Sequence, residues 1–286
     1  MTIIVAFAIL LIGVMLGLTG AGGSILTVPL LLYIGHFPLK QAIAISFFVV
    51  ALSSLVALTF HIRNKTVDWK LAVVFGFPAM LGAFVGGSNA EHLPDNLILS
   101  IFYFLMLVSG FKLAVSEAIH NETYELKWTL STYCTLSLSG LMIGLLTGLI
   151  GVGGGFLVVP ALLILAKTTS VTAIGTSLCI VVGQASFGLA GYAQHTPFDL
   201  KYASILAILC SAGSLAGGKL SGNIKNSNFK LGFGWFLLLF ATVFGTVELL
   251  NGFGHHFNDM SALRLVLLAI TELGVIVGIY KVLQAI

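Results

Sequence analysis

Two glycine-rich stretches decide how this chain folds: GLTGAGGSILTVP, from Gly17 to Pro29, and GLIGVGGGFLVVP, from Gly148 to Pro160. Each stretch follows an apolar run and leads into a short apolar segment that contains a proline. Glycine leaves helical dihedral angles at little cost, and proline disrupts a helix interior. Both stretches therefore predict a helix that breaks and restarts as a short half-helix.

The composition around these stretches excludes a soluble protein. The chain has 286 residues, of which 58% are hydrophobic and only 8% are charged, whereas a soluble domain carries about 25% charged residues. The formal charge of +3 is small and scattered, so we expect no nucleic-acid partner. Long apolar segments in lipid must satisfy their backbone groups internally. The sequence therefore predicts an all-α polytopic membrane protein whose surroundings are a lipid bilayer.

Apolar runs predict where the chain crosses the bilayer, because a crossing helix needs about 20 residues. We expect Ile3–Leu18 to be a retained helix and no signal peptide, since no basic residue precedes Lys40. Two short pieces, Ile25–Ile34 and Phe156–Ala166, follow the glycine stretches. The clear spans are Gln41–Phe60, Trp69–Gly87, Leu97–Ser116, Trp128–Gly148, Val171–Tyr192, Leu200–Gly218, Leu231–Leu250 and Ala262–Leu283.

A shift of 131 residues aligns the two halves without a gap. It pairs glycines throughout, and it also pairs rarer residues, such as Pro29 with Pro160 and Asp68 with Asp199. Chance glycine matches would not keep one register over such residues, so the chain is an internal repeat. We expect residues 1–119 to form the first repeat, 120–127 a linker, 128–250 the second repeat, and 251–286 an outer loop with an extra helix.

The halves are inverted if each short piece also crosses the bilayer, because each half then holds an odd number of crossings. Basic clusters follow Gln41–Phe60 and Leu200–Gly218. The positive-inside rule places both clusters in the cytoplasm, with the chain's N-terminus outside and its C-terminus inside a plasma (inner) membrane. If the short pieces only re-enter, the halves are parallel instead.

The broken helices are candidate anion sites. A half-helix that starts after glycines presents free backbone N–H groups and the positive end of its dipole. Two inverted broken helices that meet at mid-membrane are a transporter design. Close packing is the alternative reading of glycines spaced four apart, and we assign it to Gly13 with Gly17 and to Gly144 with Gly148. The expected substrate-binding residues are Thr19, Gly20, Ala21, Gly22, Gly23 and Ser24 in the first half and Gly151, Gly153, Gly154 and Gly155 in the second.

The doubled G-L-x-G-x-G-G-[SG]-x-L-x-V-P pattern resembles the sulfite exporter TauE/SafE family, and the resemblance covers nearly the whole chain. It implies secondary transport of a small sulfur oxyanion or sulfonate, such as sulfite, thiosulfate or an organosulfonate. No cofactor is implied. The glycine pattern by itself indicates only an anion; the sulfur comes from the resemblance.

Other polar residues within the spans are further candidates. The hydroxyls of Ser46, Thr176 and Ser177 could donate to a bound anion, or they could bond their own helix backbone. Gln184 is a mid-span amide, which usually faces protein or a cavity. Arg63 is a candidate for gating and Glu272 a candidate for coupling.

The leading hypothesis is therefore a secondary transporter that works by alternating access. A passive anion channel would share the glycine breaks. An intramembrane enzyme is disfavoured, because no catalytic motif, metal-ligand spacing or convergent carboxylates occur in the sequence. The sequence leaves open the identity of the anion, the coupling ion and the assembly, including a homodimer.

Overall fold

The computed structural model describes residues 3–20, 22–115 and 128–221, together with 234–235, 238–242 and 245. These residues form helices and no strand, which confirms the predicted all-α class. Five of the described helices are long and apolar enough to cross a membrane. The predicted spans Leu231–Leu250 and Ala262–Leu283 lie largely or wholly outside the described residues. In chain order the elements are α1 (Ile3–Thr19), α2 (Gly22–Pro29), η1 (Leu30–Ile34), α3 (Leu39–Arg63), α4 (Trp69–Asn89), η2 (Ala90–His92), α5 (Asp95–Val115), α6 (Leu130–Ile150), α7 (Gly155–Leu165), α8 (Ser170–Tyr192) and α9 (Leu200–Ser221).

Two equivalent aspartates start α4 and α9. The Asp68 carboxylate accepts a hydrogen bond from the Leu71 backbone N–H at 3.0 Å. The Asp199 carboxylate accepts from the N–H groups of Lys201 and Tyr202 at 2.9 and 3.2 Å. Both therefore satisfy donors that the first helical turn leaves free.

The first short segment is less regular than expected. The α-helix ends at Pro29, and residues Leu30–Ile34 continue as a π-helix. Proline has no N–H to donate, and its ring crowds the preceding turn. The π turn follows Pro29, and within it the Gly35 N–H bonds the carbonyl of Leu30, five residues earlier, at 2.9 Å.

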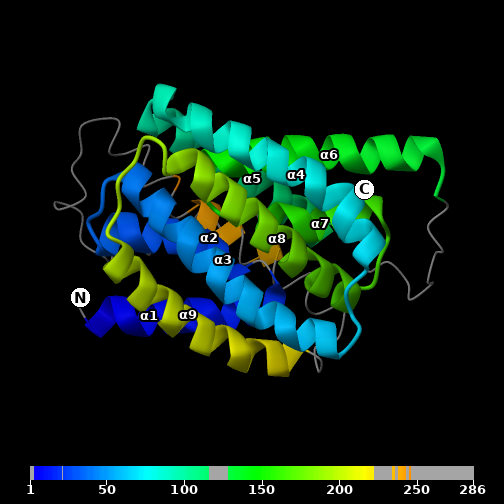
Figure 1. Cartoon of the computed structure of the whole chain (residues 1–286), viewed down its shortest axis with the longest axis horizontal. Coiled ribbons are helices and arrows are strands. Elements are labelled where there is room, and N and C mark those ends of the chain that lie inside the picture. Colours follow the sequence, from blue (N-terminus) through cyan, green and yellow to red (C-terminus); the bar gives the residue numbers. More distant parts are fainter. Residues whose placement is uncertain are drawn as a thin grey trace. The chain divides into compact units, whose positions relative to one another are not determined.

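The contacts divide the chain into two units. Unit 1 comprises Met1–Asp95 and His120–Asn226, and unit 2 comprises Asn96–Ile119 and Ser227–Ile286. In unit 2, Phe102 and Tyr103 of α5 are buried, with their ring centroids 5.3 Å apart. In unit 1, α1 lies along α9 and α4 lies along α6, with α3 and α8 between these two pairs (Figure 1).

The outer pairs of unit 1 meet backbone to backbone at glycines. A Cβ atom at Gly13 would fall on the Cys210 carbonyl, and one at Gly17 on the Ser214 carbonyl, so α1 and α9 run parallel. We call this contact the α1–α9 seam. A shift of 131 residues takes each residue of this seam to its repeat counterpart. The counterparts form the α4–α6 seam, where Gly144 meets Ala79 and Gly148 meets Ala83. The prediction that these glycines serve close packing is confirmed.

The two central helices run in opposite directions. Phe47 of α3 contacts Gly188 of α8, whereas His61, further along α3, contacts Gly175, earlier in α8. Helix α3 runs parallel to α9, because Phe37, just before α3, contacts Tyr202 and Phe60 contacts Gly218. Helix α4 runs parallel to α8, because Gly76 contacts Ile180 and Gly87 contacts Gly188. Thus α1, α3 and α9 run one way and α4, α6 and α8 the other. Each helix opposes the one that the 131-residue shift pairs with it.

The faces and ends of unit 1 differ in chemistry. Large apolar side chains are exposed along the outer helices, such as Phe77 on α4 and Ile208 on α9, which suits contact with lipid. The helix directions gather one acidic residue, Asp68, and five basic residues at one end, which we call the basic end: Arg63, Lys65, Lys70, Lys167 and Lys219. The opposite end, which we call the mixed end, carries Lys40, Lys201, Glu91, Asp95 and Asp199.

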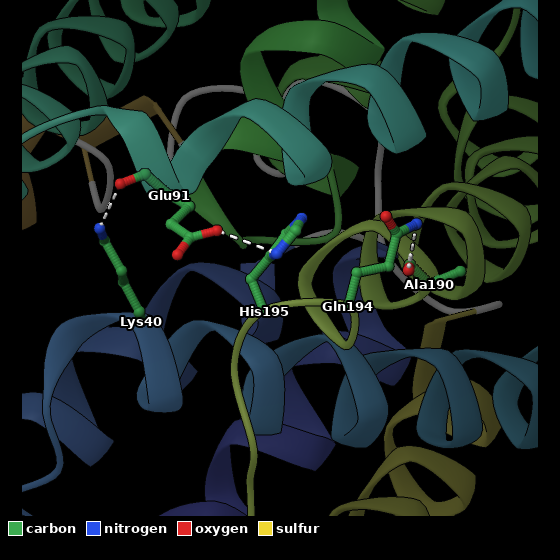
Figure 2. Close-up of polar contacts among 5 residues, drawn as sticks. All are labelled: Lys40, Glu91, Ala190, Gln194 and His195. Carbon is green, nitrogen blue, oxygen red and sulfur yellow. Dashed lines mark hydrogen bonds and ion pairs between the residues drawn. The ribbon is translucent and has the colours of Figure 1, made fainter.

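A polar cluster ties together three segments at the mixed end (Figure 2). The Lys40 ammonium at the start of α3 donates to the Glu91 backbone carbonyl at 2.8 Å. The Glu91 carboxylate lies 3.0 Å from His195 Nδ1, in the loop after α8. Both side chains of this pair are substantially exposed, so we expect it to contribute little to stability.

Candidate functional site

The second glycine stretch forms a buried turn between α6 and α7. Helix α6 ends at Ile150 and α7 begins at Gly155. Between them Gly151, Gly153 and Gly154 have φ angles of 82°, 63° and 77°. Residues with a Cβ rarely adopt these angles. The glycines therefore let the chain reverse within a space that is fully enclosed by protein, as irregular backbone at membrane depth requires.

The α6–α7 turn lies at the mid-depth of unit 1. A Cβ atom at Gly153 would lie 2.7 Å from Val50 Cγ1 and 3.7 Å from Val181 Cγ1. Val50 lies within one residue of the middle of α3, and Val181 is the middle residue of α8. The N-terminus of α7 therefore starts near the centre of the two central helices.

Gln184 of α8 points at this N-terminus. Its side chain is fully buried, and neither end of its amide has a hydrogen-bond partner among the residues that the structure describes. A Cβ atom at Gly154, the N-cap residue of α7, would fall on Gln184 Oε1. Gln184 is three residues from the middle of α8, about 5 Å along the helix axis. The amide therefore sits at mid-depth beside a helix start.

The start of α7 has the chemistry of an anion site. No side chain among the described residues caps it, and its N-cap residue is a glycine. The N–H groups of Leu157 and Val158 both bond the Gly154 carbonyl at 3.0 Å, so the donors that remain for a ligand come from the glycine turn itself. These N–H groups and the helix dipole favour negative charge. An amide NH₂ group could add donors to the same ligand.

The first glycine stretch turns near the basic end and packs on the second half. Gly20 has a φ angle of 67°, and α2 begins at Gly22, includes Gly23 and buries Ser24. Ala21 lies outside the described residues. The Ser177 hydroxyl lies 2.8 Å from the Ile174 carbonyl and 3.3 Å from the Gly20 carbonyl. Ser177 therefore links its own helix backbone to the opposite half's turn.

Ser46, the repeat counterpart of Ser177, lies on the other side of the same arrangement. Its hydroxyl is fully buried and has no partner among the described residues. It is three residues from Ile43, and a Cβ atom at Gly151 would fall on the Ile43 side chain. Each glycine turn thus packs against the central helix of the opposite half.

The remaining predicted residues lie away from the α7 start. The Thr176 hydroxyl accepts the Asp68 backbone N–H at 2.9 Å, which fixes the start of α4. The Thr19 hydroxyl donates to the Met15 carbonyl at 2.8 Å in its own helix. Arg63 is exposed in the last turn of α3, at the basic end. Glu272 lies outside the described residues.

Sequence reasoning missed Thr147, which lines the α7 start from α6. Its Oγ1 would lie 3.2 Å from a Cβ at Gly154, and its hydroxyl donates to the Ile143 carbonyl at 2.8 Å. A hydroxyl in the last turn of α6, next to the glycine stretch, was an available signal. The repeat obscured it, because the 131-residue shift pairs Thr147 with Leu16.

The two halves are unequal at the site. The counterpart of Gln184 is Ser53, whose hydroxyl bonds the Val49 carbonyl at 2.6 Å. The first half therefore places a satisfied hydroxyl where the second half places an unpartnered amide.

The fold defines a multi-pass membrane protein with a buried helix start at mid-depth, as in membrane transporters. Comparison with known families agrees: the sulfite exporter TauE/SafE family matches residues 5–244 and 136–284. The chain belongs to this family and is a membrane transporter.

Proteins similar to this chain are also named as membrane transporters. A "Probable membrane transporter protein" of Xylella fastidiosa strain Temecula1 is 35% identical over 211 residues, covering 73% of this chain and 79% of the relative. The "Probable membrane transporter protein YdhB" of Bacillus subtilis is 24% identical over 224 residues, covering 78% and 90% of the two chains. No solved structure matches the chain.

Proposed function

We propose that this protein is a secondary transporter that carries a small sulfur-containing anion, such as sulfite, thiosulfate or an organosulfonate, across the plasma membrane. The anion binds at the start of α7, where Gly153, Gly154 and Gly155 present backbone N–H groups and Gln184 presents its amide. Family membership supports transport and suggests the sulfur chemistry. The observation that carries the site is the fully buried, unpartnered Gln184 amide beside an uncapped helix start among the described residues.

Alternating access is the mechanism that this framework supports best. The backbone contacts at the two seams leave little freedom for sliding within each outer pair. The central helices α3 and α8 carry the residues that face the glycine turns. Motion of one outer pair against the other around these central helices would open the α7 start to each side of the membrane in turn.

Binding by the purified full-length protein tests the site. We expect one or more of sulfite, thiosulfate, sulfate, sulfoacetate and taurine to raise its unfolding temperature by mass action. Gln184→Met nearly keeps the volume of the side chain and removes its hydrogen-bonding groups, so it should strongly reduce the rise. Gln194→Met is the matched control, because the Gln194 amide is exposed and donates to the nearby Ala190 carbonyl at 3.3 Å (Figure 2). Equal rises in both variants would contradict the assigned site.

Flux into liposomes separates a carrier from a channel. A carrier should saturate and should show counterflow, in which unlabelled anion on one side drives labelled anion inward. Flux that rises linearly with concentration and shows no counterflow would establish the passive channel instead.

A further inference from the structure

The Gln184 amide has two unlike hydrogen-bonding ends. The NH₂ end donates and the carbonyl end accepts, whichever way the amide is turned. Both ends are buried and without partners among the described residues. A ligand that only accepts hydrogen bonds, such as sulfate, would satisfy the NH₂ end and leave the carbonyl end unpaired. A ligand with both an oxyanion oxygen and a hydroxyl would satisfy both.

Among the residues that the structure describes, the surroundings of Gln184 also lack a countercharge. Helices α1, α2, α6, α7 and α8 contain no Asp, Glu, Lys or Arg, and those in α3, α4 and α9 lie in their first or last turns. Within the described part of the chain, backbone dipoles and neutral side chains therefore provide all the stabilisation of an anion at mid-depth. Partial charges at a helix start amount to roughly half an elementary charge.

A neutral site of this kind discriminates by ligand charge. The free energy of removing an ion from water rises with the square of its charge, so a dianion is about four times as costly to bury as a monoanion of similar size. Half a charge from one helix dipole and one amide do not offset the second charge. The neutral lining therefore favours a single negative charge.

We propose that the site takes a protonated, singly charged oxyanion, hydrogen sulfite in its hydroxyl form, and rejects the sulfite dianion. This inference rests on the proposed function and adds the charge and protonation state of the ligand. The glycine-turn N–H groups and the Gln184 NH₂ bind the charged oxygens. The Gln184 carbonyl accepts the ligand hydroxyl. Each transported anion then carries a net charge of −1 and takes its one bound proton with it across the membrane.

Among the described residues, no titratable side chain on the surrounding helices contacts the Gln184 amide. Helix α7 carries none. On α8, the Tyr192 hydroxyl donates to the Leu149 carbonyl at 2.6 Å, and on α3, His61 Nδ1 lies 3.0 Å from Thr66 Oγ1, toward the basic end. The other titratable groups on the packed elements are Lys40 and Arg63 on α3, Lys70 on α4, Tyr133 and Cys134 on α6, and Cys179 on α8. A pH dependence of binding should thus come from the ligand.

The test measures the affinity of the full-length protein for three probes across the pH range in which sulfite loses its second proton. Affinity for total sulfite should fall roughly tenfold per pH unit on the alkaline side of that ionisation. Methanesulfonate has a fixed single charge and no hydroxyl, so its affinity should be weaker and independent of pH. Sulfate, a dianion throughout, should not bind. A flat sulfite profile, sulfate binding as tight as sulfite binding, or a parallel fall for methanesulfonate would each overturn the proposal.

Gln184→Met separates this inference from the proposed function. The variant should lose roughly tenfold or more of its affinity for hydrogen sulfite and should no longer prefer it to methanesulfonate. Loss of sulfite binding in this variant, together with a flat wild-type pH profile, would overturn only the charge-state proposal. Wild-type sulfite binding by the variant, or no sulfur-anion binding by the wild type at any pH, would overturn the proposed site itself and this inference with it.

Discussion

Gln184 is placed where it weakens the ligand-free fold. A buried polar group without a partner carries a desolvation penalty of about 1–3 kcal/mol. Within the described part of the chain, this amide has two such ends. Side chains kept despite such a penalty are expected at sites that bind something. The same reasoning sets Gln184 apart from Ser53 and Thr147, whose hydroxyls bond carbonyls in their own helices.

Gln184→Met should therefore stabilise the ligand-free protein. We expect the free energy of unfolding to rise by about 1–3 kcal/mol, because the apolar side chain removes the penalty at nearly constant volume. Denaturant or thermal unfolding in detergent measures the change. Gln194→Met, at an exposed position, should stay within about 0.5 kcal/mol of wild type. A destabilised Gln184→Met protein would show that the amide has an unrecognised structural partner.

Gly154→Ala should abolish anion binding. The φ angle of 77° is unfavourable for alanine, and its Cβ would displace the Gln184 amide. The strain should also lower stability by about 1–3 kcal/mol. Gly218→Ala is the control, because its Cβ would have Phe60 atoms no closer than 3.8 Å, and it should bind normally. Binding is followed by ligand-induced thermal shift, and a normal shift for Gly154→Ala would argue against a tight turn at this site.

At the scale of elements, the two seams hold the outer helix pairs together. Each seam has glycine on both helices: Gly213 and Gly217 of α9 meet the carbonyls of Leu10 and Val14, just as Gly82 and Gly86 of α4 meet those of Leu141 and Leu145. Such close backbone approach is how membrane helices associate without a hydrophobic driving force.

Gly13→Ala and Gly144→Ala should destabilise the protein to a similar extent. Each added Cβ would overlap a backbone carbonyl, so the helices must separate, and overpacking of this kind costs about 1–3 kcal/mol. Unfolding in detergent measures both changes against Gly218→Ala, which should be neutral. A strong effect in one seam with none in the other would show that the two pairs are not equivalent in the folded protein.

Much of the element level could be predicted from the sequence, because apolar runs, N-cap aspartates and glycine spacing are local signals. The boundaries of α4 and α8 differ from the predicted spans by few residues. The exchange in which Ser177 meets Gly20 of the other half could not be predicted, because it depends on how distant segments pack. The unpartnered state of Gln184 depends on every neighbour at once, so the sequence could identify the amide but not its lack of partners.

At the scale of the whole molecule, unit 1 has ends of different charge. Because α8 begins and α9 ends where α3 ends and α4 begins, Lys167 and Lys219 lie at the same end as the Arg63–Lys70 segment. At that end Lys70 Nζ also lies 3.9 Å from the centre of the Trp128 ring, and such aromatic and basic pairs are common where helices leave the bilayer. The positive-inside rule favours the basic end as cytoplasmic; this orientation stays a prediction.

Cysteine labelling tests the orientation. In a background in which the native cysteines are replaced, a single cysteine at Lys65 should react with a membrane-impermeant reagent only from the cytoplasmic side. A cysteine at Thr196, in the loop after α8, should react only from outside. Reaction of both from the same side would place the two ends on one face, which the helix directions in unit 1 do not allow.

The seams have a consequence for how such a protein can arise. Each seam joins one helix of the first half to one helix of the second half, so neither half contains both helices of a seam. An ancestor that encoded a single half would have needed two copies, inserted in opposite orientations, before the glycine–carbonyl contacts of either seam could form. Joining the two copies in one gene removes that dependence on mixed insertion. Within one gene the two copies can also differ from each other, as Gln184 and Ser53 do at matching positions.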